Sequence, residues 1–211
     1  MKIEILDNQF ELLPQKAMYW HDQKTLLISD LHLGKVMHFR KAGIAVPAIA
    51  SENNFIRLNE MVLQHEVERI LFLGDLFHNQ HNEEWERLRK WRDNYHSIEI
   101  ITILGNHDIL PKELFEQADI KLESELKADN FLFTHHPLME PDLNLYTFCG
   151  HLHPVYCLRS AAKQSLKFPC FVIDPYQAIL PSFGIFTGGY EMNTEVNRKI
   201  YLVADGKIIA V

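Results

Sequence analysis

The residues of this sequence that could do chemistry are acids, amides and imidazoles that follow short apolar runs. In chain order they are Asp30, His32, Asp75, Asn106, His107, Asp108, His135, His136, His151 and His153. Ionised carboxylates, neutral imidazoles and an amide oxygen suit divalent transition metals, above all Mn²⁺, Fe or Zn²⁺. A mononuclear site needs three or four such ligands. The set is therefore large enough for two metal ions, and Asp75, in the central cluster, is the carboxylate that we expect to bridge them.

The apolar runs that precede these residues predict five buried strands, because runs of this length rich in Ile, Leu and Phe are typical of a parallel sheet covered on both faces. Ligands of open α/β sheets bind beyond the carboxyl ends of the strands. All five polar clusters fall at those ends. The predicted strands span residues 25–29, 69–73, 98–104, 131–134 and 145–149.

Two helices are expected between the first three strands. One extends from a Ser51 cap to about His65, with Phe55, Leu58 and Val62 on one face. The second extends from an Asn82 cap to about Tyr95, and its inward residues are Trp85, Leu88 and Trp91. Strand, helix and strand in alternation predict an α/β fold.

The bulk composition predicts one domain over residues 1–211 with a sizeable core, since 47% of the chain is hydrophobic. A formal net charge of −7 argues against a broadly basic nucleic-acid surface. Three cysteines in no disulfide or zinc-binding pattern favour a reducing, cytoplasmic location. No apolar stretch is long enough to span a bilayer, so we expect no membrane association.

The ordered set Asp30-x-His32, Gly74-Asp75, Gly105-Asn106-His107-Asp108, His135 and Gly150-His151-x-His153 resembles the five-motif signature of calcineurin-like metallophosphoesterases. The resemblance implies a four-layer α/β sandwich in which two mixed β-sheets face each other and are flanked by helices. It also implies two metal ions. One is bound by Asp30, His32, Asp75 and His153, and the other by Asp75, Asn106, His135 and His151.

The same resemblance implies a mechanism, in which a hydroxide bridging the two metals attacks phosphorus in line with the leaving group. His107 would contact the phosphoryl group or protonate the leaving oxygen, and Asp108 would orient its ring.

For several neighbouring residues, the sequence is compatible with two roles. We favour His135 over His136 as the ligand because of its place in the motif, and His136 is then a supporting or structural residue. His78 could contact a substrate phosphate or be an ordinary loop histidine. Lys35 and Arg40 could guide a nucleic-acid backbone toward the metals or belong to a solvated charged loop.

A narrower resemblance covers residues 28–47 and 180–190, which are similar to the ligase-associated DNA damage response phosphoesterases of the PdeM family. Members of that family are manganese-dependent DNA endonucleases and phosphodiesterases encoded near a helicase and a DNA ligase. The resemblance therefore implies a DNA substrate, Mn²⁺ as the metal, and a functional link to a helicase and a ligase in DNA repair.

Two other functions remain compatible with the residues. The same chemistry could act on a small nucleotide, a cyclic nucleotide or a lipid-linked pyrophosphate. A non-catalytic scaffold with the same fold is the third hypothesis, although scaffolds of this kind usually lose metal ligands and this sequence keeps the full set.

Overall fold

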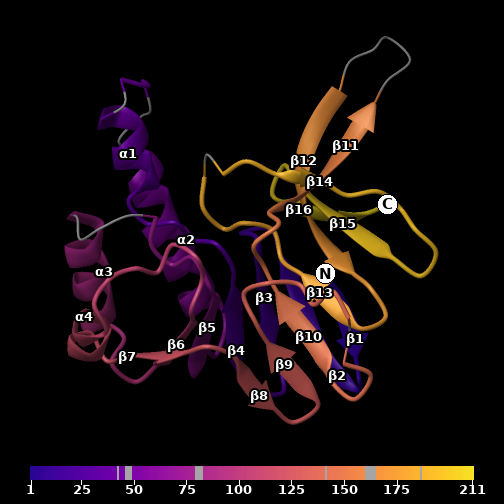
Figure 1. Ribbon diagram of the computed structural model, residues 1–211, viewed down its shortest axis with the longest axis horizontal. Coiled ribbons are helices and arrows are strands. Elements are labelled where there is room, and N and C mark those ends of the chain that lie inside the picture. Colours follow the sequence, from indigo (N-terminus) through magenta and orange to yellow (C-terminus); the bar gives the residue numbers. More distant parts are fainter. Residues whose placement is uncertain (42, 46–48, 79–82, 141, 160–164, 186) are drawn as a thin grey trace.

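The amino-terminal half of the chain forms a seven-stranded mixed sheet whose strands follow chain order (Figure 1). The computed structural model describes residues 1–211 apart from 42, 46–48, 79–82, 141, 160–164 and 186. Strands β1 to β4 are antiparallel, and β4 to β7 run parallel. The strands are β1 (Lys2–Ile5), β2 (Asn8–Leu13), β3 (Ala17–Trp20), β4 (Thr25–Ile28), β5 (Arg69–Leu73), β6 (Glu99–Ile103) and β7 (Ile120–Glu123).

The carboxyl-terminal half forms a nine-stranded mixed sheet with the order β14-β11-β12-β13-β10-β9-β8, and β15 joins it beside β12 and carries β16. Strands β9, β10 and β13 are parallel neighbours. The strands are β8 (Leu126–Ala128), β9 (Phe131–Phe133), β10 (Tyr146–Cys149), β11 (Pro154–Arg159), β12 (Ser165–Ile173), β13 (Gln177–Ile179), β14 (Tyr190–Glu191), β15 (Lys199–Ala204) and β16 (Lys207–Ala210). The predicted pair of mixed sheets is therefore confirmed.

The described helices all precede β8: α1 (Lys35–Lys41), α2 (Ile49–Gln64), α3 (Glu83–Asp93) and α4 (Lys112–Gln117). The sequence predicted α2 and α3 but neither of the short helices. Helix α2 begins at Ile49, so Ser51 lies in its first turn and is not its cap. Asn82, the predicted cap of α3, lies outside the described residues. No helix in the described part of the chain is long and apolar enough to cross a bilayer.

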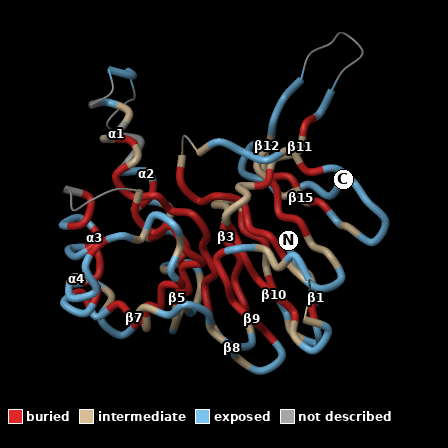
Figure 2. Tube along the Cα trace, viewed as in Figure 1, coloured by how far each residue is buried: buried red, intermediate tan, exposed pale blue. Residues whose placement is uncertain are grey.

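Three apolar clusters separate the layers. Helices α2, α3 and α4 pack on the first sheet through residues that include Leu58, Trp85 and Phe115. The two sheets pack on each other through a second cluster that includes Phe10 and Phe148. The outer face of the second sheet carries a smaller cluster, and in the described ranges no helix covers it. Figure 2 shows the buried strands at the centre and exposed connections around them.

Phe148 makes aromatic contacts both across the two sheets and within its own sheet. It is fully buried, and its ring centroid lies 4.9 Å from that of Phe10 and 5.4 Å from that of Phe133. It also lies on β10, which leads into the polar cluster at Gly150 and His151. The packing between the two sheets therefore supports one of the strand ends that carry the predicted ligands.

Phe148→Ala should lower the free energy of unfolding by about 3 to 5 kcal/mol, because it removes buried contacts and leaves a cavity between the sheets. Urea unfolding measures this difference. Leu63→Ala is the control, since Leu63 is 79% exposed and its loss should change stability by less than about 0.5 kcal/mol. A similar small change in both variants would contradict the central place of Phe148.

Candidate metal centre

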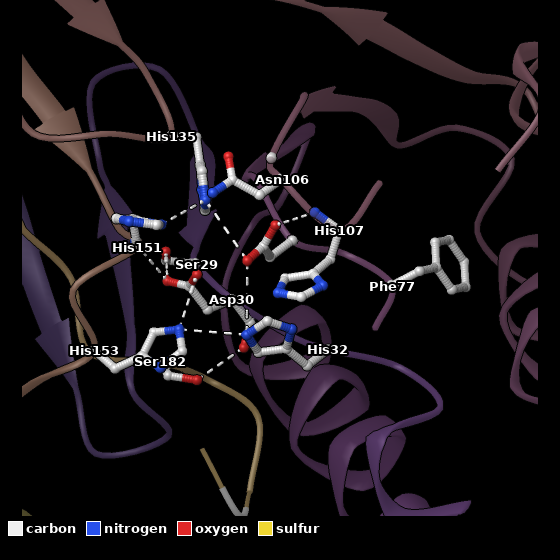
Figure 3. Close-up of polar contacts among 12 residues, drawn as sticks. Ser29, Asp30, His32, Phe77, Asn106, His107, His135, His151, His153 and Ser182 are labelled. Carbon is white, nitrogen blue, oxygen red and sulfur yellow. Dashed lines mark hydrogen bonds and ion pairs between the residues drawn. The ribbon is translucent and has the colours of Figure 1, made fainter. Parts of the chain in front are cut away.

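The strand ends of both sheets meet in one place, as the sequence predicted (Figure 3). Asp30 follows β4, Asp75 follows β5 and Asn106 follows β6 in the first sheet, whereas His135 follows β9 and His151 follows β10 in the second. A main-chain bridge between Ser29 and Ser182 further joins the two halves beside the site. The site is therefore assembled from segments that are distant in the sequence.

The backbone at the site is held in an uncommon conformation. Asp30, His32, Asp75, His151 and His153 have φ values of 52°, 49°, 50°, 67° and 49°. Left-handed φ angles in non-glycine residues cost about 1 to 3 kcal/mol each and persist only where surrounding contacts enforce them. Here the Asp30 amide donates to the Gly74 carbonyl at 3.2 Å, and the His32 amide donates to the Asp75 carbonyl at 2.9 Å.

Two of the glycines that precede the reactive residues have different roles. Gly74 has a φ of +82°, a left-handed conformation that lets the backbone turn sharply after β5. Gly150 does not have a left-handed φ angle. It lies against the loop after β4, and a Cβ atom at position 150 would overlap the Ser29 hydroxyl. Its role is to let the second sheet approach Asp30 closely.

Each of the two buried carboxylates has one oxygen held by the protein and one directed at imidazoles. Asp30 Oδ2 accepts hydrogen bonds from the Ser29 hydroxyl and, at 3.0 Å, from the His151 amide, while Oδ1 lies 3.1 Å from Nε2 of His153. Asp75 Oδ1 accepts from the His107 amide at 2.9 Å. The other Asp75 oxygen lies 3.8 Å from Nε2 of His32.

Asp75 lies between two groups of nitrogen atoms, because the same Oδ2 is also 3.6 Å from Nε2 of His135. On one side, the Nε2 atoms of His32 and His153 are 3.3 Å apart. On the other side, His135 Nε2 and His151 Nδ1 are 3.1 Å apart. Two nitrogens bound to one ion at about 2.1 Å are separated by about 3.0 to 3.4 Å. The spacing therefore fits two adjacent ions that share Asp75.

The protonation states also suit metal binding. Burial lowers the pKa of His32 to about 3, and burial likewise lowers the pKa of His151, so both rings are neutral near pH 7. Burial alone would raise the pKa of Asp30, but the hydrogen bond and charge of His153 and the Ser29 hydroxyl outweigh it and lower that pKa. An ionised Asp30 beside the neutral rings of His32 and His151 gives a site whose negative charge divalent cations would balance.

His135 and His136 differ in orientation, which the sequence could not resolve. His135 is buried, and its Nδ1 lies 3.0 Å from the Leu73 carbonyl, so Nε2 faces Asp75. His136 is exposed, and its Nε2 lies 2.9 Å from Oδ1 of Asn106. Both rings lie near His151, but only His135 is directed at the central carboxylate.

His107 is an exposed residue whose ring centroid is 5.5 Å from that of His32. The expectation that Asp108 orients this ring is not supported. The Asp108 carboxylate instead accepts 3.0 Å hydrogen bonds from the main-chain amides of Phe77 and Gly105. Burial raises the Asp108 pKa against the effect of these two amides. Asp108 therefore joins the loops after β5 and β6.

Of the residues predicted to touch substrate, His78 and Lys35 lie at the site. The His78 ring centroid is 5.1 Å from that of His107. Lys35 begins α1; burial lowers its pKa, and the nearby charges of Asp30 and Asp75 oppose that shift. Arg40 is exposed near the end of α1, and the described contacts do not join it to the metal-type residues.

Two residues that support Asp30 were not predicted from the sequence. Ser29 donates to its carboxylate, and the Ser182 hydroxyl donates to its main-chain carbonyl at 2.9 Å. Ser29 directly precedes the first motif, and this position in the sequence could have indicated its supporting role. Ser182 lies in the segment that the narrower resemblance covered, but nothing in its spacing indicated a contact with Asp30.

Comparisons with known proteins identify a family and similar structures. A family model for calcineurin-like phosphoesterases matches residues 23–206. The crystal structure of the Pseudomonas putida nuclease MPE has a TM-score of 0.86 and 30% sequence identity, covering 100% of this chain and 99% of that chain. The E. coli phosphoesterase Yfce gives a TM-score of 0.47 at 15% identity, covering 88% of this chain and 96% of that chain. A comparison with curated proteins gives no match.

The family model covers most of the residues, and the nuclease structure is similar over the full length of both chains. The resemblance inferred from the five motifs is confirmed. This chain belongs to the calcineurin-like phosphoesterase family.

Proposed function

We propose that this protein is a binuclear metal-dependent phosphodiesterase that cleaves DNA. The observation that carries the proposal is the position of Asp75, whose one oxygen faces the imidazoles of two separate ligand groups. A nucleic-acid substrate is supported by the 30% identical P. putida nuclease, and the choice of DNA rests on the sequence resemblance. A role in DNA repair, with a functional link to a helicase and a ligase, rests on the sequence resemblance alone.

Seven residues would hold the two ions, with Asp75 shared between them. Asp30, His32 and His153 form one group of possible ligands, and Asp30, Asp75 and His135 form another. His151 and the Asn106 amide oxygen complete the second site. This is the ligand set Asp30, His32, Asp75, Asn106, His135, His151 and His153, for which we propose Mn²⁺, with Fe or Zn²⁺ as alternatives. When bound, such ions lower the pKa of water and stabilise charge on a phosphoryl group.

The chain's own residues bind and orient the substrate around this centre. Asn106 and His107 are exposed at the rim, whereas Asp30 and Asp75 are buried beneath it. A phosphodiester approaching from solvent would therefore meet the His107 ring first. His107 would donate a proton to the leaving oxygen, and Lys35 and His78 would contact the non-bridging oxygens.

Cleavage assays with the purified protein and Mn²⁺ test the substrate. Single-stranded DNA should be cut internally, and excess chelator should abolish the reaction because it removes the ions. Parallel reactions would contain a cyclic nucleotide, a nucleotide pyrophosphate and a generic aryl phosphodiester. Rapid turnover of one of these small esters without any DNA cleavage would refute the nuclease proposal and favour a small-molecule esterase.

Asp75→Asn should reduce DNA cleavage by about 1000-fold or more, because the loss of a shared ligand removes several kcal/mol of transition-state stabilisation. The amide keeps the shape of the side chain, so the fold should remain. Metal analysis should show fewer bound ions per chain. Asp93→Asn is the control, since Asp93 is exposed on α3 and should leave both quantities unchanged. Full activity in Asp75→Asn would exclude the proposed centre.

His107→Ala should lower kcat by about 100- to 10,000-fold while both metal ions stay bound. The hydrogen bond from residue 107 to Asp75 comes from the main-chain amide, so it survives the substitution. Rapid-quench cleavage and metal analysis measure the two effects separately. Loss of metal together with activity would show that His107 acts on the ligands and not on the substrate.

A double-mutant cycle separates the two possible roles of Asp108. If Asp108 joins the loops, Asp108→Asn should still lower the rate in the His107→Ala background. If Asp108 orients the His107 ring, its substitution should have no further effect once the ring is absent.

A further inference from the structure

The segment 182–184 lies directly behind the first metal-type residue, Asp30. The Phe183 amide donates to the Ser29 carbonyl at 2.8 Å, and the Gly184 amide donates to the Asp30 carbonyl at 3.0 Å. The Ser182 hydroxyl donates to the same Asp30 carbonyl at 2.9 Å. Three hydrogen bonds from one segment thus hold the backbone that presents the Asp30 carboxylate.

Arg57, on the opposite side of this segment, fastens it to helix α2. Its guanidinium donates to the Phe183 carbonyl at 2.7 Å and to the Gln15 carbonyl at 3.2 Å, and it lies 3.9 Å above the centroid of the Phe183 ring. The buried Asn54 side chain accepts a further bond at 2.8 Å. A planar fork can serve several carbonyls and stack on a ring at the same time, which a lysine cannot do.

Lys16 adds a second cationic contact to the same segment, because its ammonium group donates to the Gly184 carbonyl at 2.8 Å. Burial lowers the pKa of Arg57 to about 10, and burial together with the Arg57 charge lowers that of Lys16 to about 7. Burial of the basic side chains of Arg57 and Lys16 is therefore unfavourable for their charged forms. Both side chains bind the 182–184 segment, which holds Asp30.

We propose that Arg57 is a positioning residue for the metal centre, which acts through Phe183 and the 182–184 segment to hold Asp30. The space around Asp30 leaves little freedom once the segment is fixed, since a Cβ at Gly184 would lie 2.7 Å from the Leu31 carbonyl. Arg57 touches neither a metal ligand side chain nor the rim. The inference rests on the metal sites proposed above, and it assigns no part in phosphoester chemistry to Arg57.

Titration calorimetry of the metal-free protein with Mn²⁺ tests the inference. Arg57→Ala should weaken binding of one ion by about 10- to 100-fold, the range seen when a residue that orients a ligand is lost. The ion bound through His135 and His151 should keep its affinity. Amide hydrogen exchange should become faster at Phe183 and Gly184, whose hydrogen bonds to Ser29 and Asp30 would open more often.

Arg92 provides a matched control. It is a buried arginine on α3 whose guanidinium donates to the main-chain carbonyls of Tyr95 and Ala118 and to the Asp119 carboxylate, far along the chain from the 182–184 segment. Arg92→Ala should lower the free energy of unfolding but leave Mn²⁺ affinity unchanged. Equal losses of affinity in both variants, or wild-type affinity in Arg57→Ala, would overturn the inference.

Two milder substitutions keep the test decisive if Arg57→Ala does not fold. Arg57→Lys retains the charge without the fork, and Phe183→Leu retains the carbonyl without the ring. Each should weaken the same ion by a smaller factor, and unchanged affinity in both would overturn the inference. A wild-type protein that binds two Mn²⁺ ions but does not cut DNA would refute the proposed nuclease function and leave the role of Arg57 standing.

Discussion

The structure depends on the burial of two carboxyl groups, those of Asp30 and Asp75, where the sheets meet. A buried charge is costly unless hydrogen bonds and an opposite charge compensate it. The protein supplies the hydrogen bonds to one oxygen of each carboxylate. The remaining oxygens face the imidazoles of His32, His135 and His153, where metal cations from solution would complete the compensation.

This requirement explains the strained geometry of the strand ends. Ligand side chains from five strands converge only if the backbone turns sharply after each strand, which gives several Asp and His residues left-handed φ angles. The core between the sheets and the hydrogen bonds between neighbouring loops stabilise that arrangement. Asp108 and Arg57 contribute in a similar way, since each holds neighbouring segments together through hydrogen bonds with main-chain groups.

Solvent exposure increases from the carboxylates at the base of the site to the residues at its rim. Asp30 and Asp75 are buried, the imidazoles around them are buried or half-buried, and Asn106 and His107 are exposed at the rim. Lys35 places a positive charge at the start of α1 near both acids. An anionic phosphodiester can therefore be attracted locally although the whole chain carries a net charge of −7.

The sequence by itself determined the five strands that lead into the site, the family and the set of candidate metal ligands. Short apolar runs that end in Asp, Asn or His are local patterns, and their order is specific enough to identify a family. The helices α2 and α3 were predicted for the same reason, because their apolar periodicity is local. Short α1 and α4 carry too few turns for such a pattern and were missed.

Only the tertiary structure decided which of two adjacent histidines faces Asp75, what Asp108 binds, and that Arg57 contacts Phe183. Adjacent side chains along a strand-like segment point in different directions, and the sequence does not show which of the two faces the partner sheet. The Arg57 to Phe183 contact joins residues 126 positions apart. Contacts of this kind form only when separate layers pack together. The spacing of residues along the chain therefore cannot predict them.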